Sequence, residues 1–180
     1  MQAVAVFCGS KSGKNELFEI HARQLGASLA GAGLRVVYGG GSKGLMGAVA
    51  NAALAAGGVV LGVIPEKLRS WEHQHDGITE LHVVPDMHTR KRMMYEWCDA
   101  AIILPGGFGT MDELFEMLTW NQLAIHDKPI YVLNSGGFYS DLFQMMQVMH
   151  REGFLYDDLS KRVQIFDLPQ SLVASLLPKR

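Results

Sequence analysis

Residues 100–113, AAIILPGGFGTMDE, lead from an apolar strand through a glycine turn directly into the start of a helix. Such a strand–turn–helix unit is the building block of parallel α/β folds. A helix that begins this way also attracts anions, because its first backbone N–H groups and the positive end of its dipole point out of the turn. Glycine lets a phosphate approach the backbone closely. The segment therefore predicts both the fold class and a phosphate site.

The composition is typical of one globular domain, which we expect to span residues 1–180, with 48% hydrophobic and 19% charged residues. The net charge is −2 and no basic stripe is present, so nucleic acid is not an expected partner. No apolar stretch approaches the ~20 residues that a membrane span needs, and residues 1–8 lack the basic start of a signal peptide. The two cysteines, Cys8 and Cys98, fit buried thiols in a reducing compartment. We therefore expect a cytoplasmic protein without a membrane partner.

Short β-rich runs alternate with helical patterns along the whole chain, which is typical of βαβ units stacked around a parallel sheet. Most runs are continuously apolar, as in strands covered on both faces. The predicted strands are 3–8, 34–38, 59–64, 80–84, 100–104, 130–133 and 162–166. The predicted helices are 15–32, 45–56, 88–97, 111–125, 139–151 and 169–177. We expect a Rossmann-like, three-layer α/β fold with a central, mostly parallel sheet.

Four strand-to-helix loops are expected to form the ligand site, because ligands of such sheets bind beyond the carboxyl ends of the strands. These loops are 9–14, 39–44, 85–88 and 106–110. Two of them are glycine-dense, and three carry Ser or Thr where it can cap a helix. The crevice is therefore expected to surround a phosphate and a sugar.

Glu113 is expected to place a carboxylate in the first turn of the helix after the PGG turn. A site for phosphate alone would gain nothing from this charge, so Glu113 either caps the helix or acts on another part of a phosphorylated ligand. Residues 110–113 also fit the capping box S/T-x-x-E, in which Thr110 and Glu113 satisfy each other's backbone donors. Taken alone, the motif leaves both interpretations open. The glycines before it and the cationic helix 88–97 favour a ligand site.

Three consecutive cations, Arg90, Lys91 and Arg92, lie in that cationic helix. Arg92 can pair with Glu96 at i,i+4, and simple solvation would account for Lys91. Arg90 instead shares a helix face with Met94 and Trp97. A guanidinium beside apolar groups is where a carboxylate or phosphate partner is most useful. We therefore predict that Arg90 is functional.

The sequence predicts neither a metal site nor a nucleoside triphosphate site. His73, His75 and Asp76 lie in the longest connection without another cluster at ligand spacing. The loop 39–44, GGGSKG, lacks the GK[ST] ending of a Walker A motif.

The helix 111–125 is apolar on nearly every side. A surface helix would keep a polar face. Two explanations stay open from the pattern: a second subunit covers the helix, or the helix lies in the centre of the core.

With these residues in view, the chain resembles the LONELY GUY (LOG) family, phosphoribohydrolases that release cytokinins from their nucleotides and were long labelled lysine decarboxylases. The resemblance covers nearly the whole chain. It rests on two paired motifs, HxRK at 88–91 and PGGxGTxxE at 105–113. Other matching stretches are 7–10, 38–47, 62–65, 119–123 and 125–129. Residues 69–76 follow no strict family pattern and are expected to border the base.

The resemblance implies that Arg90 and Glu113 form the catalytic pair. It also implies a homodimer that needs no metal or other cofactor. The implied phosphate and ribose contacts, from the two glycine loops, are Gly41, Ser42, Gly107, Gly109 and Thr110. We expect four further residues of the motifs and loops to bind substrate, namely Ser10, Met87, Lys91 and Gly106.

The implied reaction is hydrolysis of the N-glycosidic bond of a purine nucleoside 5′-monophosphate, of the cytokinin type or of adenosine. It would release the free base and ribose 5-phosphate. Glu113 would stabilise the positive charge that grows on the sugar, and Arg90 would orient Glu113 and stabilise the departing base. Two rival functions stay open. One is a carrier that binds a nucleotide or nucleotide cofactor without cleaving it, and the other is a pyridoxal-phosphate decarboxylase, with Lys43 or Lys91 as the Schiff-base lysine.

Overall fold

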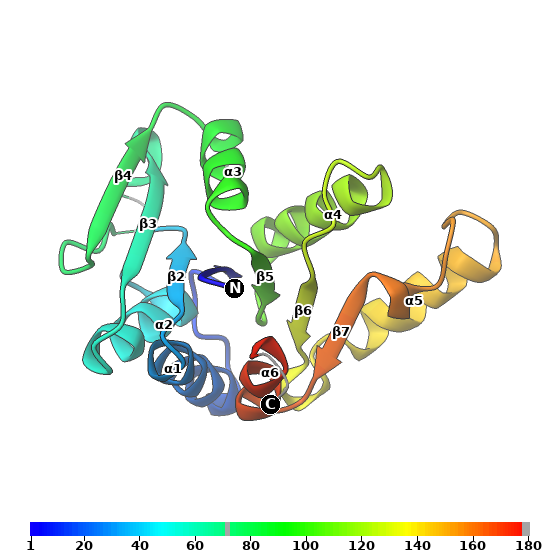
Figure 1. Ribbon diagram of the computed structural model, residues 1–180, viewed down its shortest axis with the longest axis horizontal. Helices are drawn as coiled ribbons and strands as arrows, with labels where there is room; N and C mark the ends of the chain where they lie inside the picture. Colours follow the sequence, from blue (N-terminus) through cyan, green and yellow to red (C-terminus); the bar gives the residue numbers. More distant parts are fainter. Residues whose placement is uncertain (71–72, 178–180) are drawn as a thin grey trace.

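A computed structural model describes residues 1–70 and 73–177, and its centre is a seven-stranded sheet (Figure 1). The strand order is β4-β3-β2-β1-β5-β6-β7, and each pair of neighbouring strands is parallel. The strands are β1 (Ala3–Phe7), β2 (Arg35–Tyr38), β3 (Val60–Pro65), β4 (Glu80–Val84), β5 (Ala100–Ile103), β6 (Ile130–Leu133) and β7 (Val163–Phe166). All seven predicted strands are therefore confirmed.

Helices cover both faces of the sheet, which confirms the three-layer prediction (Figure 1). One face carries α1 (Glu16–Gly31), α2 (Gly44–Ala55) and α6 (Pro169–Leu176). The other carries α3 (Met87–Glu96), α4 (Phe108–Gln122) and α5 (Ser140–Arg151). Alternation along β1 explains the two cores: Val4 and Val6 pack with α1, α2 and α6, whereas Ala3, Ala5 and Phe7 pack on the opposite side.

The order of the strands reverses between β1 and β5. From β1 the chain runs outward through β2, β3 and β4, and it then returns to β5 on the other side of β1. The loop after β1 therefore leads to a helix on one face, and the loop after β5 leads to a helix on the other, which opens a crevice between them. The amide of Gly9 donates to the carbonyl of Pro105 at 3.0 Å across this point.

Two of the helices begin at side-chain caps. The Asn15 side chain accepts from the Leu17 amide at 3.0 Å, and the Asp86 side chain accepts from the Thr89 amide at 2.7 Å. Each bond satisfies one of the amides that a helix start leaves open. The bond from the Thr89 amide is also the main reason why the pKa of Asp86 lies below its ordinary value.

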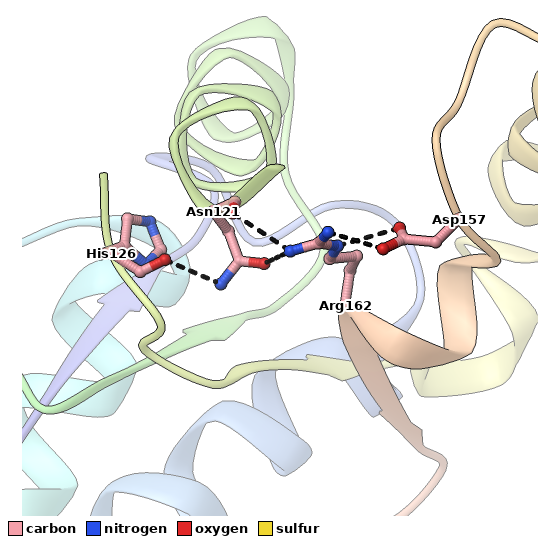
Figure 2. Close-up of polar contacts among 4 residues, drawn as sticks. All are labelled: Asn121, His126, Asp157 and Arg162. Atoms are coloured by element: carbon pink, nitrogen blue, oxygen red, sulfur yellow. Dashed lines mark hydrogen bonds and ion pairs between the residues drawn. The ribbon is translucent and has the colours of Figure 1, made fainter. Parts of the chain in front are cut away.

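The carboxyl-terminal end of α4 is joined to the start of β7 by a polar network (Figure 2). Arg162 donates through Nη1 to the Asn121 side-chain oxygen at 2.7 Å and to its carbonyl at 3.1 Å. The other side of the guanidinium pairs with Asp157 at 2.6 Å, and Asn121 donates onward to the His126 carbonyl at 3.5 Å. The network therefore holds the far end of the helix whose other end faces the crevice.

Neither cysteine is in a disulfide, and the thiols of Cys8 and Cys98 are both buried, as expected. Among the described residues, no helix combines the length and the apolar character needed to cross a lipid bilayer.

The helices α1 and α2 pack closely because Gly26 has no side chain. A Cβ atom at Gly26 would overlap the carbonyl oxygen of Val49 on α2. This close approach helps to bring the start of α2 to the first loop, where the amides of Leu45 and Met46 both donate to the Gly9 carbonyl, at 3.1 and 3.3 Å.

We expect Gly26→Ala to lower the free energy of unfolding by about 1–3 kcal/mol, the usual cost of forcing a methyl group into a packed interface. Gly31→Ala, in the same helix, is the matched control. A Cβ atom there meets nothing within 4 Å, so the gain in helix propensity should stabilise the protein by up to about 1 kcal/mol. Urea unfolding measures both changes as shifts of the midpoint, provided that the dependence of the free energy on urea concentration is the same in each variant. Equal effects of the two substitutions would contradict the packing argument.

Candidate functional site

A cavity of about 470 Å³ lies at the carboxyl ends of the central strands. Its lining comes from the loops after β1 and β5 and from the helices α1, α2, α3 and α4, among other segments. Eight of the predicted site residues line it: Ser10, Met87, Arg90, Gly106, Gly107, Gly109, Thr110 and Glu113. The structure therefore brings the two paired motifs to one cavity.

The start of α4 differs from the prediction in a way that matters for the site. The helix begins at Phe108 and not at residue 111, and its N-cap is Gly107, which has no capping side chain. Thr110 is therefore inside the helix, so the interpretation of residues 110–113 as a capping box is wrong. Glu113 lies in the second turn, where it faces the cavity rather than the helix end.

The first turn of α4 is a suitable place for a phosphate. The first amides of a helix have no partner within the helix, and here the N-cap offers no side chain to occupy them. Thr110 packs directly over Gly106, where a Cβ atom would overlap its hydroxyl oxygen. The Tyr139 hydroxyl donates to the Leu104 carbonyl at 2.6 Å, just before the turn. The turn is therefore held in place before any ligand arrives.

Arg90 reaches the cavity from α3, although its side chain is only 5% exposed. Nη2 donates to the Gly39 carbonyl at 3.3 Å, and Nη1 lies 3.7 Å from the Met87 sulfur. A Cβ atom at Gly39 would overlap the guanidinium, so this glycine makes room for Arg90. The cation thus lies beside apolar groups, as predicted from the helix face.

Glu113 reaches the same cavity from α4 and is 9% exposed. Burial is the main reason why the pKa of the Tyr139 hydroxyl is raised, and the charges of Cys8 and Glu113 raise it further. An acidic group and a guanidinium from separate helices therefore share one partly enclosed space. There a charge interacts more strongly than it does in water.

Gly41 and Ser42 are not among the residues that line the cavity. The amide and the hydroxyl of Ser42 both donate to the His73 carbonyl, at 2.8 and 2.7 Å, and Gly41 forms a bridge with Gln74. The second glycine loop thus holds the segment that follows η1 (Glu66–Leu68). Within the predicted base-bordering segment 69–76, residues 71 and 72 lie outside the described residues. The ligand roles of Gly41 and Ser42 stay predictions.

Lys91 is also absent from the lining. Its ammonium lies 3.1 Å from Asp112 and 3.0 Å from Glu116, both on α4. The interpretation of Lys91 as simply solvated is therefore wrong. The neighbouring Arg92 does lie near Glu96, at 3.9 Å, as the i,i+4 spacing predicts.

Several lining residues were not predicted, notably Cys8, Phe18, Leu68 and Phe138. Cys8 directly precedes the first loop, so its place at the end of β1 was a usable signal. The rings of Phe18 and Phe138 meet edge to face with centroids 5.5 Å apart, although they are far apart in the sequence. No local pattern predicts such a pair.

A buried pair supports the loop that carries Phe138. His21 Nδ1 and Ser135 Oγ lie 2.8 Å apart, and both residues are buried. Ser135 begins the short helix η2 (Ser135–Gly137), which leads directly to Phe138. Burial lowers the pKa of His21, which favours the neutral ring.

Comparison with known proteins agrees with this geometry. A family model described as "Possible lysine decarboxylase" matches residues 46–176. The chain is 44% identical over 176 residues to the cytokinin riboside 5′-monophosphate phosphoribohydrolase of Rhodococcoides fascians. This alignment covers 97% of this chain and 89% of that protein. It is 47% identical over 152 residues to the cytokinin riboside 5′-monophosphate phosphoribohydrolase LOG7 of Arabidopsis thaliana, covering 84% and 70%.

Among solved structures, the molybdenum cofactor carrier protein of Chlamydomonas reinhardtii aligns with a TM-score of 0.74 and covers 97% of this chain and 95% of that one. The two sequences are only 20% identical, so this likeness concerns the fold alone.

We expect the protein to lose stability as the pH falls below about 6.5, the ordinary pKa of histidine. Burial lowers the pKa of His21 in the folded protein, so below about pH 6.5 the unfolded chain binds more protons than the folded one. The contribution of the neutral His21 ring to stability is therefore complete only above that pH and is lost as the pH falls. His126, whose pKa burial also lowers, acts in the same direction. Urea unfolding measures the free energy of unfolding at about pH 7.5 and at about pH 5.5. The difference between these two free energies should be smaller for His21→Gln than for the native chain. An identical pH dependence in both proteins would contradict this role.

Proposed function

Because the chain belongs to the LOG family, we propose that it is a phosphoribohydrolase that cleaves the N-glycosidic bond of a purine nucleoside 5′-monophosphate. The products are the free base and ribose 5-phosphate. The observation that carries the proposal is that Arg90 and Glu113 line one cavity together with the open start of α4. The relatives named above, which are cytokinin riboside 5′-monophosphate phosphoribohydrolases, support the same reaction.

In this mechanism the 5′-phosphate binds the first turn of α4, and that anchor positions the ribose within the cavity. Cleavage passes through a sugar with growing positive charge at the anomeric carbon. The Glu113 carboxylate stabilises this charge and orients the attacking water, as a general base. Arg90 stabilises the negative charge on the departing base.

The decarboxylase alternative needs a lysine that forms a Schiff base in the cavity. The two lysines considered for it, Lys43 and Lys91, are not among the residues that line the cavity. Lys91 is held by two carboxylates, so its amine is charged rather than nucleophilic. Lys11 does line the cavity, but it is exposed and so lacks the desolvation that usually activates a lysine amine. The geometry therefore favours the hydrolase.

Incubation with adenosine 5′-monophosphate and with isopentenyladenosine 5′-monophosphate should release free base and ribose 5-phosphate. We expect Arg90→Ala and the nearly isosteric Glu113→Gln each to lower kcat by at least ~100-fold, the scale for losing a positioned electrostatic or acid–base group. Arg92→Ala, at an exposed arginine of the same helix, should leave turnover unchanged. The corresponding nucleosides should react poorly, because they lack the phosphate anchor.

Native turnover that survives in both Arg90→Ala and Glu113→Gln would overturn the residue assignment. Tight nucleotide binding with no base release by the native protein would instead favour the carrier. The relative rates with the two monophosphates decide whether the base is adenine or its N6-prenylated form.

We also propose that α4 contributes to a homodimer interface. Leu114 and Met117 are buried against the sheet, so one face of the helix is already covered. The apolar residues Phe115, Leu123 and Ile125, on the helix or directly after it, are 37%, 60% and 60% exposed. A helix in the centre of the core would not leave these side chains exposed. A second copy of the chain is the partner that the family resemblance implies.

Sedimentation of the native protein should give twice the mass of the chain, and the double substitution Leu123→Glu with Ile125→Glu should give the mass of a monomer. Burying two new carboxylates in an apolar interface is costly. Phe154→Glu is the control, because Phe154 is 77% exposed on another part of the surface. A native protein that sediments as a monomer at micromolar concentration would contradict the dimer.

We further propose that residues 1–180 form a single domain and that the protein is cytoplasmic. Its two cysteines are buried and form no disulfide, as is usual in a reducing compartment.

A further inference from the structure

Three charged side chains link α3 to α4 beside the cavity. The Lys91 ammonium lies 3.1 Å from an oxygen of Asp112 and 3.0 Å from an oxygen of Glu116. The lysine side chain is only 12% exposed, and that of Glu116 is 24% exposed. The cluster is therefore well shielded from water on the lysine side.

The cluster is next to the catalytic pair in the sequence but points elsewhere. Lys91 follows Arg90, and Asp112 precedes Glu113. Neighbouring residues of a helix project about 100° apart, since a turn takes 3.6 residues. The arginine and Glu113 therefore face the cavity, while Lys91 and Asp112 meet outside its lining.

The cluster ties α3 to α4 at two points. Asp112 and Glu116 are four residues apart, so they lie on one face of α4, one turn from each other. A single ammonium between them resists both separation of the helices and sliding of one along the other. At the other end of α3, the Tyr95 ring meets the Trp120 ring of α4 edge to face, with centroids 5.2 Å apart. The ion pairs of Lys91 are the link between the two helices that lies next in sequence to Arg90 and Glu113.

The lysine keeps its charge in this setting. Burial by itself disfavours the charged form, but the hydrogen bonds to Glu116 and Asp112 outweigh it, and the pKa of Lys91 is raised. The link is therefore an ion pair throughout the neutral range of pH.

We propose that Lys91 is a positioning residue of the hydrolase, which clamps α3 to α4 through Asp112 and Glu116 and so maintains the productive separation of Arg90 and Glu113. This inference rests on the proposed function of the same cavity. It gives Lys91 a role that differs from the direct substrate contact expected from the motif. Small displacements of reacting groups are costly, since a misplacement of ~1 Å can slow a reaction by ~100-fold.

The test compares substitutions on both sides of the clamp. Lys91→Met should lower kcat by about 10- to 100-fold and change KM by less than about 2-fold, because the substrate contacts remain. The double substitution Asp112→Asn with Glu116→Gln should reproduce this loss, and adding Lys91→Met to it should cost little more. Lys91→Arg should retain most of the turnover, because a guanidinium can pair with both carboxylates. Arg92→Met, which removes an exposed cation of the same helix, should change neither constant.

A second measurement does not depend on turnover. Hydrogen exchange of the ligand-free protein should be faster in residues 87–96 for Lys91→Met than for the native chain or for Arg92→Met. Unchanged exchange in that helix would overturn the clamp, whether or not the protein hydrolyses the nucleotides tested.

The other outcomes separate the alternatives. A raised KM in Lys91→Met, with normal kinetics after the double carboxylate substitution, would mean that the lysine binds substrate, and it would overturn the proposal. A lower stability towards urea with an unchanged kcat would mean a purely structural ion pair, which also overturns it. Failure of the native protein to release base would count against the proposed function, while the exchange measurement would still decide the clamp.

Discussion

The structure depends on the adjacency of β1 and β5 at the centre of a parallel sheet. The chain leaves the two strands towards opposite faces, and the bond from the Gly9 amide to the Pro105 carbonyl joins the loops where they part. This divergence opens the crevice, and it aims the amides at the start of α4 into it. In the proposed mechanism, a phosphate held there leaves the rest of a nucleotide within reach of Arg90 and Glu113. The sheet is thus the reason that side chains from two helices line one cavity.

The two glycine-rich loops do different physical work despite their similar composition. The loop at 106–109 is open at the start of α4, so it is available to a ligand. In the loop at 39–44, by contrast, many polar groups of the backbone are used within the chain. Gly40 accepts from the His75 amide, Ser42 donates to His73, and the amides at the start of α2 donate to Gly9. Gly39 serves mainly to make room for a guanidinium. A glycine run therefore indicates close approach, but it does not say whether a ligand or the protein itself approaches.

The fold and the chemistry are separable in this protein. A molybdenum cofactor carrier shares the architecture at 20% sequence identity, so the sheet and its helices do not by themselves imply hydrolysis. The side chains that enter the cavity distinguish the possible functions. A carboxylate there would repel a bound phosphate unless it faced another part of the ligand, and the six-residue distance from the N-cap to Glu113 provides that separation. Arg90, buried beside a carbonyl and a thioether, is fixed in place from the opposite helix.

The sequence by itself determined the features that local physics controls. Apolar runs and helical spacing predicted the seven strands and six α-helices of the described residues, because burial on two faces and amphipathic periodicity leave a direct pattern in the chain. The motifs around Arg90 and Glu113 likewise predicted a shared cavity. The start of α4 was predicted three residues late, since Thr110 resembles a cap while the actual cap is a glycine without a side chain. Only the tertiary structure decided three sets of contacts. They are the ion pairs of Lys91, the hydrogen bond from the Ser42 hydroxyl to the His73 carbonyl, and the ring contact between Phe18 and Phe138. The reason is that these contacts join residues far apart in the chain, whose relative positions are set by strand order and helix packing rather than by any local preference.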